Sequence, residues 1–300
     1  MHISVMQNSG PMMRSVSDDI YSQLQSRRNG TPNRVADLVK TSAPNSSISP
    51  DFYGEWMHIY PNCITPTNRS GHFSVYSETQ HKLWVGYGAT CTGELLGDVW
   101  CFDTINKIWK QLRLSGDRLP PRTGARGSMF NEIIVLFGGY DGGKYLTDLH
   151  TIDTRTGKVT LVGSLPGEPS ARSTPITGVY GEEFFVWGGF NGKYPPELNV
   201  LDLRSRTWSS IEQNQVQGRT SVDSAAIGDK LYVYGGSKRG GLIVIDLKNK
   251  TVIKKMTIGS EPPSAVLGGG MASFDHYIFF FGGKSATSKW TLLYCCDIEN

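Results

Sequence analysis

Short apolar runs, each followed by a pair of small residues, recur five times along the chain. The runs are only four to six residues long and rich in aromatic and β-branched side chains, which is typical of buried strands rather than helices. The small-residue pairs begin at positions 88, 138, 188, 235 and 282, so the period is 50, 50, 47 and 47 residues. A fixed period of this size indicates one supersecondary unit that is copied and stacked.

Each copy contains four parts. It opens with a small, polar phrase such as 69–75, and the apolar run follows. The glycines then let the backbone turn and approach its neighbours without a Cβ clash. A third strand ends in aspartate, and a turn rich in Asn, Gly, Arg and Lys leads to a fourth strand. The aspartates are Asp103, Asp153, Asp202, Asp246 and Asp297, and the fourth strands start at Trp109, Val159, Trp208 and Val252. Four short antiparallel strands per copy predict one blade of a β-propeller.

The order of these phrases resembles the kelch repeat, whose signature is a double glycine, a later Trp and a Pro-Arg before the first strand. The resemblance covers residues 52–300 and fits the kelch period of about 50 residues. The first copy departs from it with Gly88–Ala89, two copies carry Val159 and Val252 instead of Trp, and the fifth has Ser264 instead of Arg. The resemblance implies an all-β fold, a kelch-type β-propeller of five four-stranded blades.

The two ends of the chain suggest how the ring closes. The chain stops where the turn before the last fourth strand should begin, and a matching strand stands near the other end, at residues 54–59. We expect this N-terminal strand to complete the fifth blade, because pairing would cover an exposed sheet edge. The alternative is a truncated gene product that lacks further blades. Residues 52–300 are thus the predicted propeller, and the Ser- and Asn-rich residues 1–51 a flexible or partly helical tail.

The apolar runs and the cysteines of the chain bear on the compartment in which the protein is expected. No run reaches the roughly 20 apolar residues of a membrane span, and the first residues lack the apolar stretch of a signal peptide. Five cysteines are an odd number, and Cys101 and Cys295 hold the same strand position in two copies. These cysteines indicate a reducing compartment. We therefore expect a cytoplasmic protein, with export as an effector through residues 1–51 as the alternative.

Motifs for catalysis, metals and cofactors are incomplete. The segment 138–144 has the spacing of a phosphate-binding loop, but Tyr145 stands where Ser or Thr would hold magnesium, and a strand follows instead of a helix. Glu94 and Asp98 match two positions of the Glu-x3-Asp-x3-His iron motif of the kelch-like plant specifier proteins, but Phe102 replaces the histidine. The six histidines show no paired metal spacing. The sequence therefore predicts no cofactor, metal or catalytic residue.

The loop before the first strand and the loop after the glycines should emerge on one face, because strand direction alternates within a blade. The first set of loops brings four arginines and Ser264 near the central channel, and the second set brings further cations. The predicted partner-binding residues are Arg69, Arg122, Arg172, Arg219, Ser264, Lys144, Lys193, Lys238, Arg239 and Lys284. They would form a ring of cations around one mouth of the channel. The alternative is that the arginines, which belong to the kelch pattern, have a structural role.

These features favour a protein-interaction module that binds an acidic or phosphorylated segment of a partner protein at the loop face. Loops on a rigid ring are where binding residues concentrate, and a fold alone does not fix function. One alternative is an enzyme with an active site at the channel mouth, which would need convergent groups with shifted pKa values. Another is a cytoskeletal or secreted effector scaffold that uses the outer edges or the tail. The sequence gives no sign of a nucleic-acid or membrane partner.

Overall fold

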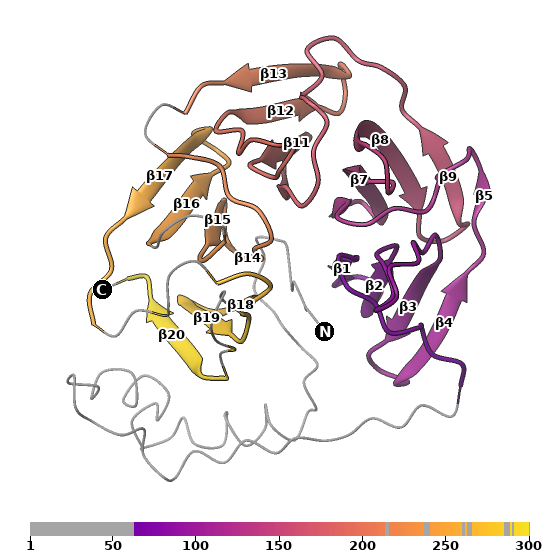
Figure 1. Ribbon diagram of the computed structural model, residues 1–300, viewed down its shortest axis with the longest axis horizontal. Helices are drawn as coiled ribbons and strands as arrows, with labels where there is room; N and C mark the ends of the chain where they lie inside the picture. The colour runs from indigo at the N-terminus through magenta and orange to yellow at the C-terminus, as the bar shows by residue number, and fades with distance from the viewer. Residues whose placement is uncertain are drawn as a thin grey trace.

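The computed structural model describes residues 63–213, 216–236, 241–259, 262, 266–284, 289 and 291–299. This part of the chain consists of 20 β-strands and contains no helix. The strands form five small sheets around a central axis, which confirms the five-bladed propeller (Figure 1). The tail predicted for residues 1–51 and the closing strand at 54–59 lie outside the described residues. Among those described, no segment forms a helix long and apolar enough to span a bilayer.

In each blade the strands succeed one another in chain order from the central axis to the outer edge. The first strand lies next to the axis, and consecutive strands pair antiparallel. Blade 1 comprises β1 (Phe73–Ser77), β2 (Lys82–Gly86), β3 (Val99–Asp103) and β4 (Ile108–Leu112). Blade 2 comprises β6 (Arg126–Phe130), β7 (Ile133–Tyr140), β8 (Tyr145–Asp153) and β9 (Lys158–Leu161), with β5 (Ser115–Gly116) at its outer edge. Blade 3 comprises β10 (Ile176–Tyr180), β11 (Glu183–Trp187), β12 (Leu198–Asp202) and β13 (Thr207–Ile211). Blade 4 comprises β14 (Ser224–Ile227), β15 (Lys230–Val233), β16 (Leu242–Asp246) and β17 (Thr251–Lys255), and blade 5 comprises β18 (Gly270–Phe274), β19 (Tyr277–Phe281) and β20 (Leu293–Asp297).

The segment that leads into a blade also covers the outer strand of that blade. β5 pairs in parallel with β9, which adds a fifth strand to blade 2. In blade 3 the Trp208 amide donates to the Pro166 carbonyl at 3.0 Å, and in blade 4 the Val252 amide donates to Gln213 Oε1 at 2.9 Å. These contacts satisfy the backbone of an otherwise open edge. Blade 5 has three strands among the described residues, so its completion by residues 54–59 stays a prediction.

The aspartate that ends each third strand has a structural explanation. Its carboxylate accepts backbone N–H groups of the following turn, as an Asx turn does. The Asp103 carboxylate accepts from the Asn106 amide at 2.8 Å, and the Asp153 carboxylate accepts from the Thr156 amide at 2.9 Å. The same hydrogen bonds hold the pKa of both carboxyls below its usual value. The repeated aspartates therefore set the turn between the third and fourth strands.

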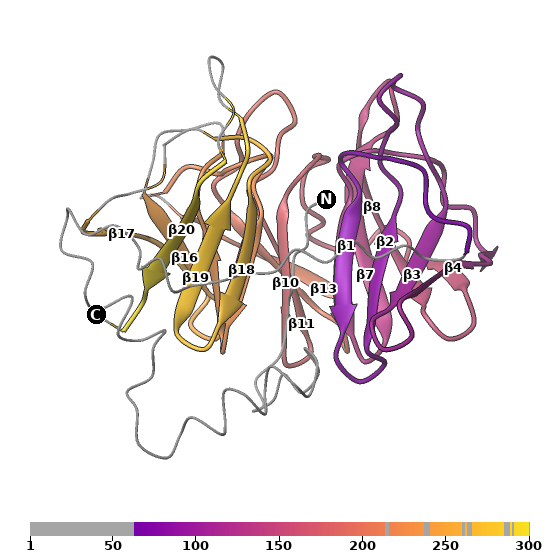
Figure 2. The same ribbon diagram turned by 90° about the horizontal axis from the view of Figure 1, so that it is seen from below.

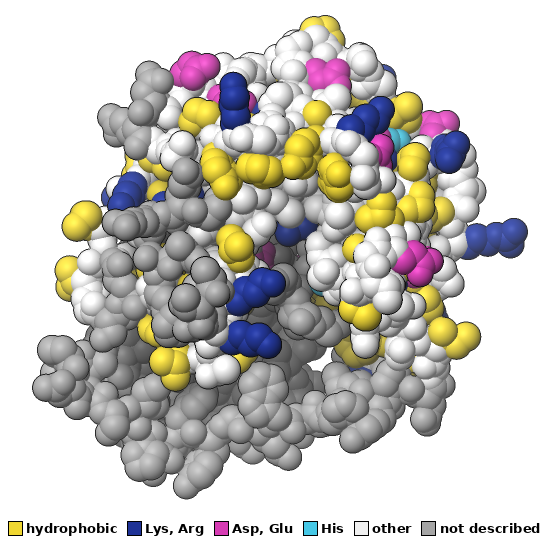
Figure 3. Space-filling model, viewed as in Figure 1, with side chains coloured by type: hydrophobic (Ala, Val, Ile, Leu, Met, Phe, Trp, Pro, Cys, Tyr) yellow, Lys and Arg dark blue, Asp and Glu magenta, His cyan; other side chains and the backbone are white. Residues whose placement is uncertain are grey.

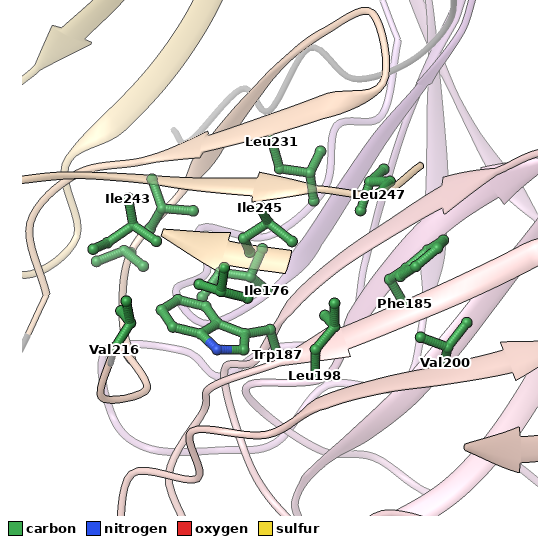
Figure 4. Packing of buried hydrophobic residues seen from close by; sticks show 13 residues of the cluster. Ile176, Phe185, Trp187, Leu198, Val200, Val216, Leu231, Ile243, Ile245 and Leu247 are labelled. Carbon is green, nitrogen blue, oxygen red and sulfur yellow. The ribbon is translucent and has the colours of Figure 1, made fainter. Parts of the chain in front are cut away.

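The hydrophobic core lies between blades. One buried cluster joins blades 1 and 2, and three more lie between blades 2 and 3, 3 and 4, and 4 and 5. Figure 4 shows the third of these, where Trp187 of β11 packs beside Ile176 of β10 and Leu198 of β12, facing Ile243 and Ile245 of β16. A single blade cannot bury both of its faces, so each blade depends on its neighbours for stability.

Hydrogen bonds between blades revise the alignment of the first copy. The second glycine of a pair donates its N–H to a carbonyl of the next blade, as Gly139 does to Arg172 at 2.9 Å. In blade 1 this donor is Gly88, which bonds the Arg122 carbonyl at 2.8 Å. The first pair is therefore Tyr87–Gly88 and not Gly88–Ala89. The sequence pattern did not reveal this pair because its first residue is Tyr87 and not glycine. Tyr87 adopts the left-handed backbone conformation, with φ of 60°, that glycine adopts in the other blades.

Candidate functional site

The structure brings the two predicted sets of loops together on one end of the ring. Single β-bridges join them within blades, for example Ser70 to Ala89, Thr123 to Tyr140 and Leu267 to Lys284. Figure 2 shows β1 starting at the upper end in that view, which is the side turned towards the reader in Figure 1. We call this end the loop face. The antiparallel order of strands explains it, because the first strand starts where the second one finishes.

The four repeat arginines (Arg69, Arg122, Arg172 and Arg219) lie inside the blades. Each donates from Nη1 to the carbonyl of the first residue of the glycine pair in its own blade. The acceptors are Tyr87 at 3.3 Å, Gly138 and Gly188 at 3.1 Å, and Gly235 at 2.8 Å. Arg122 and Arg172 are 1% and 0% exposed. A guanidinium buried to this degree needs compensation within the fold.

Carboxylates that precede the third strands supply this compensation. Arg69 binds Asp98 through two hydrogen bonds of 2.6 and 2.9 Å, and Arg122 binds Asp148 through two of 2.5 and 2.9 Å. Arg172 donates to Glu197 at 2.9 Å. Such two-pronged contacts fix the guanidinium plane as well as neutralising its charge. At the corresponding position of blade 4 the chain has Gly241.

These contacts favour the structural alternative for the repeat arginines. The side chains of Arg69, Arg122 and Arg172 tie the glycine pair to the residue before the third strand, whereas the predicted ring requires charges that face the channel mouth. Their binding of a partner stays an untested prediction. The fifth blade also differs from expectation, because the Gly236 amide donates to the Val266 carbonyl at 2.8 Å and so places Val266, not Ser264, at the arginine position. Ser264, Lys238 and Arg239 lie outside the described residues.

The predicted lysines that the structure describes are solvent-exposed on the loop face. Lys144 and Lys193 follow the glycine pairs of blades 2 and 3, and Lys284 lies at the mouth of the central channel. Figure 3 shows Lys and Arg side chains beside the hollow at the centre of this face. The loops that carry two of them are held by Asx turns, in which Asp141 Oδ1 accepts from the Lys144 amide at 2.8 Å. The backbone at Lys144 is therefore fixed while its ammonium group stays in water.

A row of aromatic rings between these lysines was missed by the sequence analysis. Tyr140 and Tyr145 of blade 2 lie 5.3 Å apart between ring centroids, and Tyr145 meets Phe190 of blade 3 edge-on at 5.9 Å. Phe190 contacts Tyr194 at 5.2 Å. All four rings are half-buried, so each presents one part to solvent. We call these residues the aromatic row; the aromatic residues that follow the glycine pairs at 140 and 190 are the signal that could have revealed it.

A shallow depression opens beside the aromatic row. Its lining includes Lys193, Tyr194, Pro195, Pro196 and Gln217, and its volume is about 500 Å³. Figure 3 shows apolar side chains in a row above the central hollow, over blades 2 and 3. Half-exposed aromatic rings are typical of the central part of a protein-binding site, and charged side chains such as these lysines are typical of its polar rim.

The central channel forms a second hollow, with a volume of about 300 Å³. The first strands of the blades line it, with hydroxyl groups from Ser74, Ser128 and Thr177. Its charged lining residues are Arg126, Asp223 and Lys284, and the sequence analysis named only the last of these. Arg126 and Asp223 do not follow the repeat pattern, so the repeats gave no signal for them. Among the described residues, no cluster of side chains suits a metal ion.

A buried histidine beside the Arg122–Asp148 pair gives a pH prediction. His150 is 2% exposed, and its Nδ1 lies 3.5 Å from an Asp148 oxygen. Burial holds the pKa of His150 below its usual 6.5, because the charged form loses its hydration. The unfolded chain then binds a proton more readily than the folded protein. We expect the free energy of unfolding to fall as the pH drops from 6.5 towards the lowered pKa.

Urea unfolding at a series of pH values checks this expectation. His150→Gln should flatten the pH dependence below 6.5, whereas His276→Gln, which removes a half-buried histidine next to Asp275, should leave it in place. Equal pH slopes for the wild-type protein and His150→Gln would contradict the prediction.

Comparison with known proteins identifies relatives for this architecture. The family model described as the KLHDC2/KLHL20/DRC7 Kelch-repeats domain matches residues 51–236. Kelch domain-containing protein 1 of Mus musculus is 24% identical over 259 residues, which cover 73% of this chain and 63% of that protein. Kelch domain-containing protein 3 of Rattus norvegicus is 26% identical over 187 residues, covering 58% and 48%. Rab9 effector protein with kelch motifs of Mus musculus is 32% identical over 196 residues, covering 58% and 51%. The chain spans less than two thirds of the length of each of these relatives.

Proposed function

Since this chain belongs to the family of the KLHDC2/KLHL20/DRC7 kelch-repeats domain, we propose that it is a protein-interaction module that binds a segment of another protein on its loop face. The observation that carries the proposal is the aromatic row with Lys144 and Lys193 at its sides. One of the relatives is named an effector of another protein, Rab9, which agrees with an interaction role.

The chemistry of this surface specifies the partner segment. The aromatic rings and the prolines of the depression suit an apolar or aromatic side chain, and the two exposed lysines suit carboxylates or phosphate groups next to it. The partner is therefore an acidic or phosphorylated segment with one apolar anchor. Exposed ion pairs contribute only about 0–1 kcal/mol each, so the aromatic contacts supply most of the affinity and the lysines supply orientation.

Phe190→Ala tests the proposal. Phe190 contacts Tyr145 and Tyr194, so its loss removes the centre of the row. Acidic peptides, with and without phosphoserine, are selected on the full-length wild-type chain from a display library, and their affinities are measured by fluorescence polarisation. We expect Phe190→Ala to weaken binding about 30-fold, as for a central aromatic contact of about 2 kcal/mol.

The matched control is Phe274→Ala. Phe274 is an exposed aromatic residue at the far end of β18, away from the loop face, and its replacement should leave the affinity unchanged. Replacing Lys144 and Lys193 together by Gln should reduce the salt dependence of binding, whereas Lys158→Gln on β9 should not. Equal loss of affinity in Phe190→Ala and Phe274→Ala would refute the assignment of the site.

A further inference from the structure

Arg126 of β6 differs from the repeat arginines in its contacts. Its Nη1 donates to the His72 carbonyl at 3.1 Å and to the Ala125 carbonyl at 3.2 Å. Among the residues that the structure describes, none accepts a hydrogen bond from its Nε or Nη2, and no ion pair joins it to a carboxylate. The side chain is half-buried and contributes to the lining of the central channel. The edge of the guanidinium that carries Nε and Nη2 is therefore the part that a molecule in the channel can bind.

The charged side chains of the channel favour a ligand with a single negative charge. Arg126 and Lys284 are the cations of the lining and Asp223 is its carboxylate, so the three sum to one positive charge. Asp223 is engaged with the backbone, because its two oxygens accept from the Ser224 amide at 2.9 Å and the Met271 amide at 3.4 Å. Burial lowers the pKa of Arg126, and the field of Asp223, which acts in the opposite direction, does not offset this effect. A bound anion would supply the missing compensation.

The remainder of the lining suits a small apolar group. Its larger aliphatic members come from four different blades and are Val75, Ile176, Val222 and Leu267. Two of its hydroxyl groups satisfy each other, since Ser128 donates to Thr177 at 3.0 Å. The volume of about 300 Å³ is at the lower end for ligand pockets, which is enough for a molecule of a few carbon atoms.

We propose that the central channel binds a short aliphatic monocarboxylate, with its two oxygens on Nε and Nη2 of Arg126 and its hydrocarbon chain among the aliphatic residues of the lining. Two donors on adjacent nitrogens of a planar guanidinium match the two oxygens of a planar carboxylate. A doubly charged phosphate exceeds the single positive charge of the lining and is repelled by Asp223, and a neutral molecule leaves Arg126 without an acceptor. The site is separate from the aromatic row, since none of the row residues lines the channel.

Ligand-detected NMR on the full-length protein tests the inference, with acetate, propionate, butyrate and isovalerate as probes at constant ionic strength. We expect dissociation constants in the millimolar range or below, and affinity that rises from acetate to isovalerate as the hydrocarbon chain displaces water from the channel. Isovaleramide, which has the same shape without the charge, should bind about tenfold more weakly or worse. Inorganic phosphate should not compete with isovalerate.

Variants locate the site. Arg126→Gln should abolish isovalerate binding, because the amide side chain lacks both the charge and the fork of two nitrogens. The matched control is Arg155→Gln, which removes an exposed arginine of the same blade and should leave the affinity unchanged. Thermal melting of each variant is measured in parallel. Where Arg126→Gln does not fold, Arg126→Lys replaces it, because it keeps the charge but not the planar fork, and its affinity should be about tenfold lower.

Several results would overturn the inference. These are no binding of any of the acids to the wild-type chain, equal binding of isovaleramide, competition by phosphate, or undiminished affinity in the folded Arg126 variant. Displacement of the acidic peptides by isovalerate would also overturn it, since the channel would then hold a carboxylate of the partner segment. Phe190→Ala should bind isovalerate as the wild-type protein does, so failure of acid binding and failure of peptide capture by the aromatic row are distinguishable.

Discussion

Replacing Arg122 with alanine will lower the free energy of unfolding by about 3–5 kcal/mol. The Arg122 side chain is 2% exposed and holds Asp148 through two hydrogen bonds, while its Nη1 also reaches the Gly138 carbonyl. Its removal leaves a carboxylate and a carbonyl without their donors and opens a void inside blade 2. The cost is large because the Arg122 site is buried, so that water does not take over its hydrogen bonds, and because His150, the described basic group beside Asp148, is held in its neutral form by burial. Equilibrium unfolding in urea measures it.

Arg155 in the same blade provides the matched control. It also pairs with a carboxylate, since Nε donates to Glu132 at 2.5 Å, but its side chain is 74% exposed. Arg155→Ala should change the free energy of unfolding far less than Arg122→Ala does, as water replaces the lost partner. The double variant Arg122→Met, Asp148→Leu should recover much of the stability that Arg122→Ala loses, because neither charge is then left alone. Similar losses in Arg122→Ala and Arg155→Ala would contradict the structural role.

This experiment also bears on the ring of cations that the sequence predicts. If Arg122→Ala is folded as stably as the wild-type protein and loses affinity for acidic peptides, the repeat arginines bind the partner directly. If it loses stability, their contribution to binding is indirect. Affinity must therefore be measured at a temperature at which both the wild-type protein and Arg122→Ala are folded, because unfolding alone would abolish binding whatever the role of Arg122.

Replacing Trp187 with alanine will lower the free energy of unfolding by about 3–5 kcal/mol. Trp187 is 1% exposed and lies in the cluster that joins blades 3 and 4, where Figure 4 shows it beside Ile176 and Leu198. Its Nε1 also donates to the Pro196 carbonyl at 2.9 Å. This loss of stability has three sources. A large apolar surface is no longer buried on folding, a cavity remains that the rigid sheets cannot close, and the Pro196 carbonyl loses its hydrogen-bond donor. Urea unfolding with near-ultraviolet circular dichroism measures it.

Trp109 in β4 is the comparison residue. Whereas Trp208 at the matching position of blade 3 is buried, Trp109 keeps part of its surface in water on the outer strand and packs on Phe102 at 5.1 Å. Trp109→Ala should therefore cost only about 1–2 kcal/mol, within the ordinary range for a partly buried side chain. A loss for Trp109→Ala that matches that of Trp187→Ala would mean that the outer strands contribute as much as the packing between blades, against the arrangement of the clusters.

The chain sequence was sufficient for the architecture because each blade repeats one local pattern. The apolar runs form the second strands, the aspartates set the turns before the fourth strands, and the glycine pairs after the second strands hydrogen-bond to the next blade. The sequence analysis misplaced the first small-residue pair by one residue, because Tyr87 adopts a backbone conformation that is usually left to glycine. It also misplaced the fifth arginine position, which is Val266. Both errors arose where a residue breaks the repeat while the backbone keeps it.

The site depended on contacts between segments far apart in the sequence. The sequence showed that arginines recur before the first strands, but whether they face solvent or carboxylates depends on Asp98, Asp148 and Glu197, each 25 to 29 residues away. Sequence patterns carry the period and the type of each strand, because these follow from local backbone preference and alternation. Burial, ion pairing and the position of Arg126 and Asp223 on the lining of one channel follow only from the packing of the blades, which places inner strands of separate blades around that channel. The sequence by itself therefore determined the propeller, and the tertiary structure alone decided which of its charges remain available to a ligand.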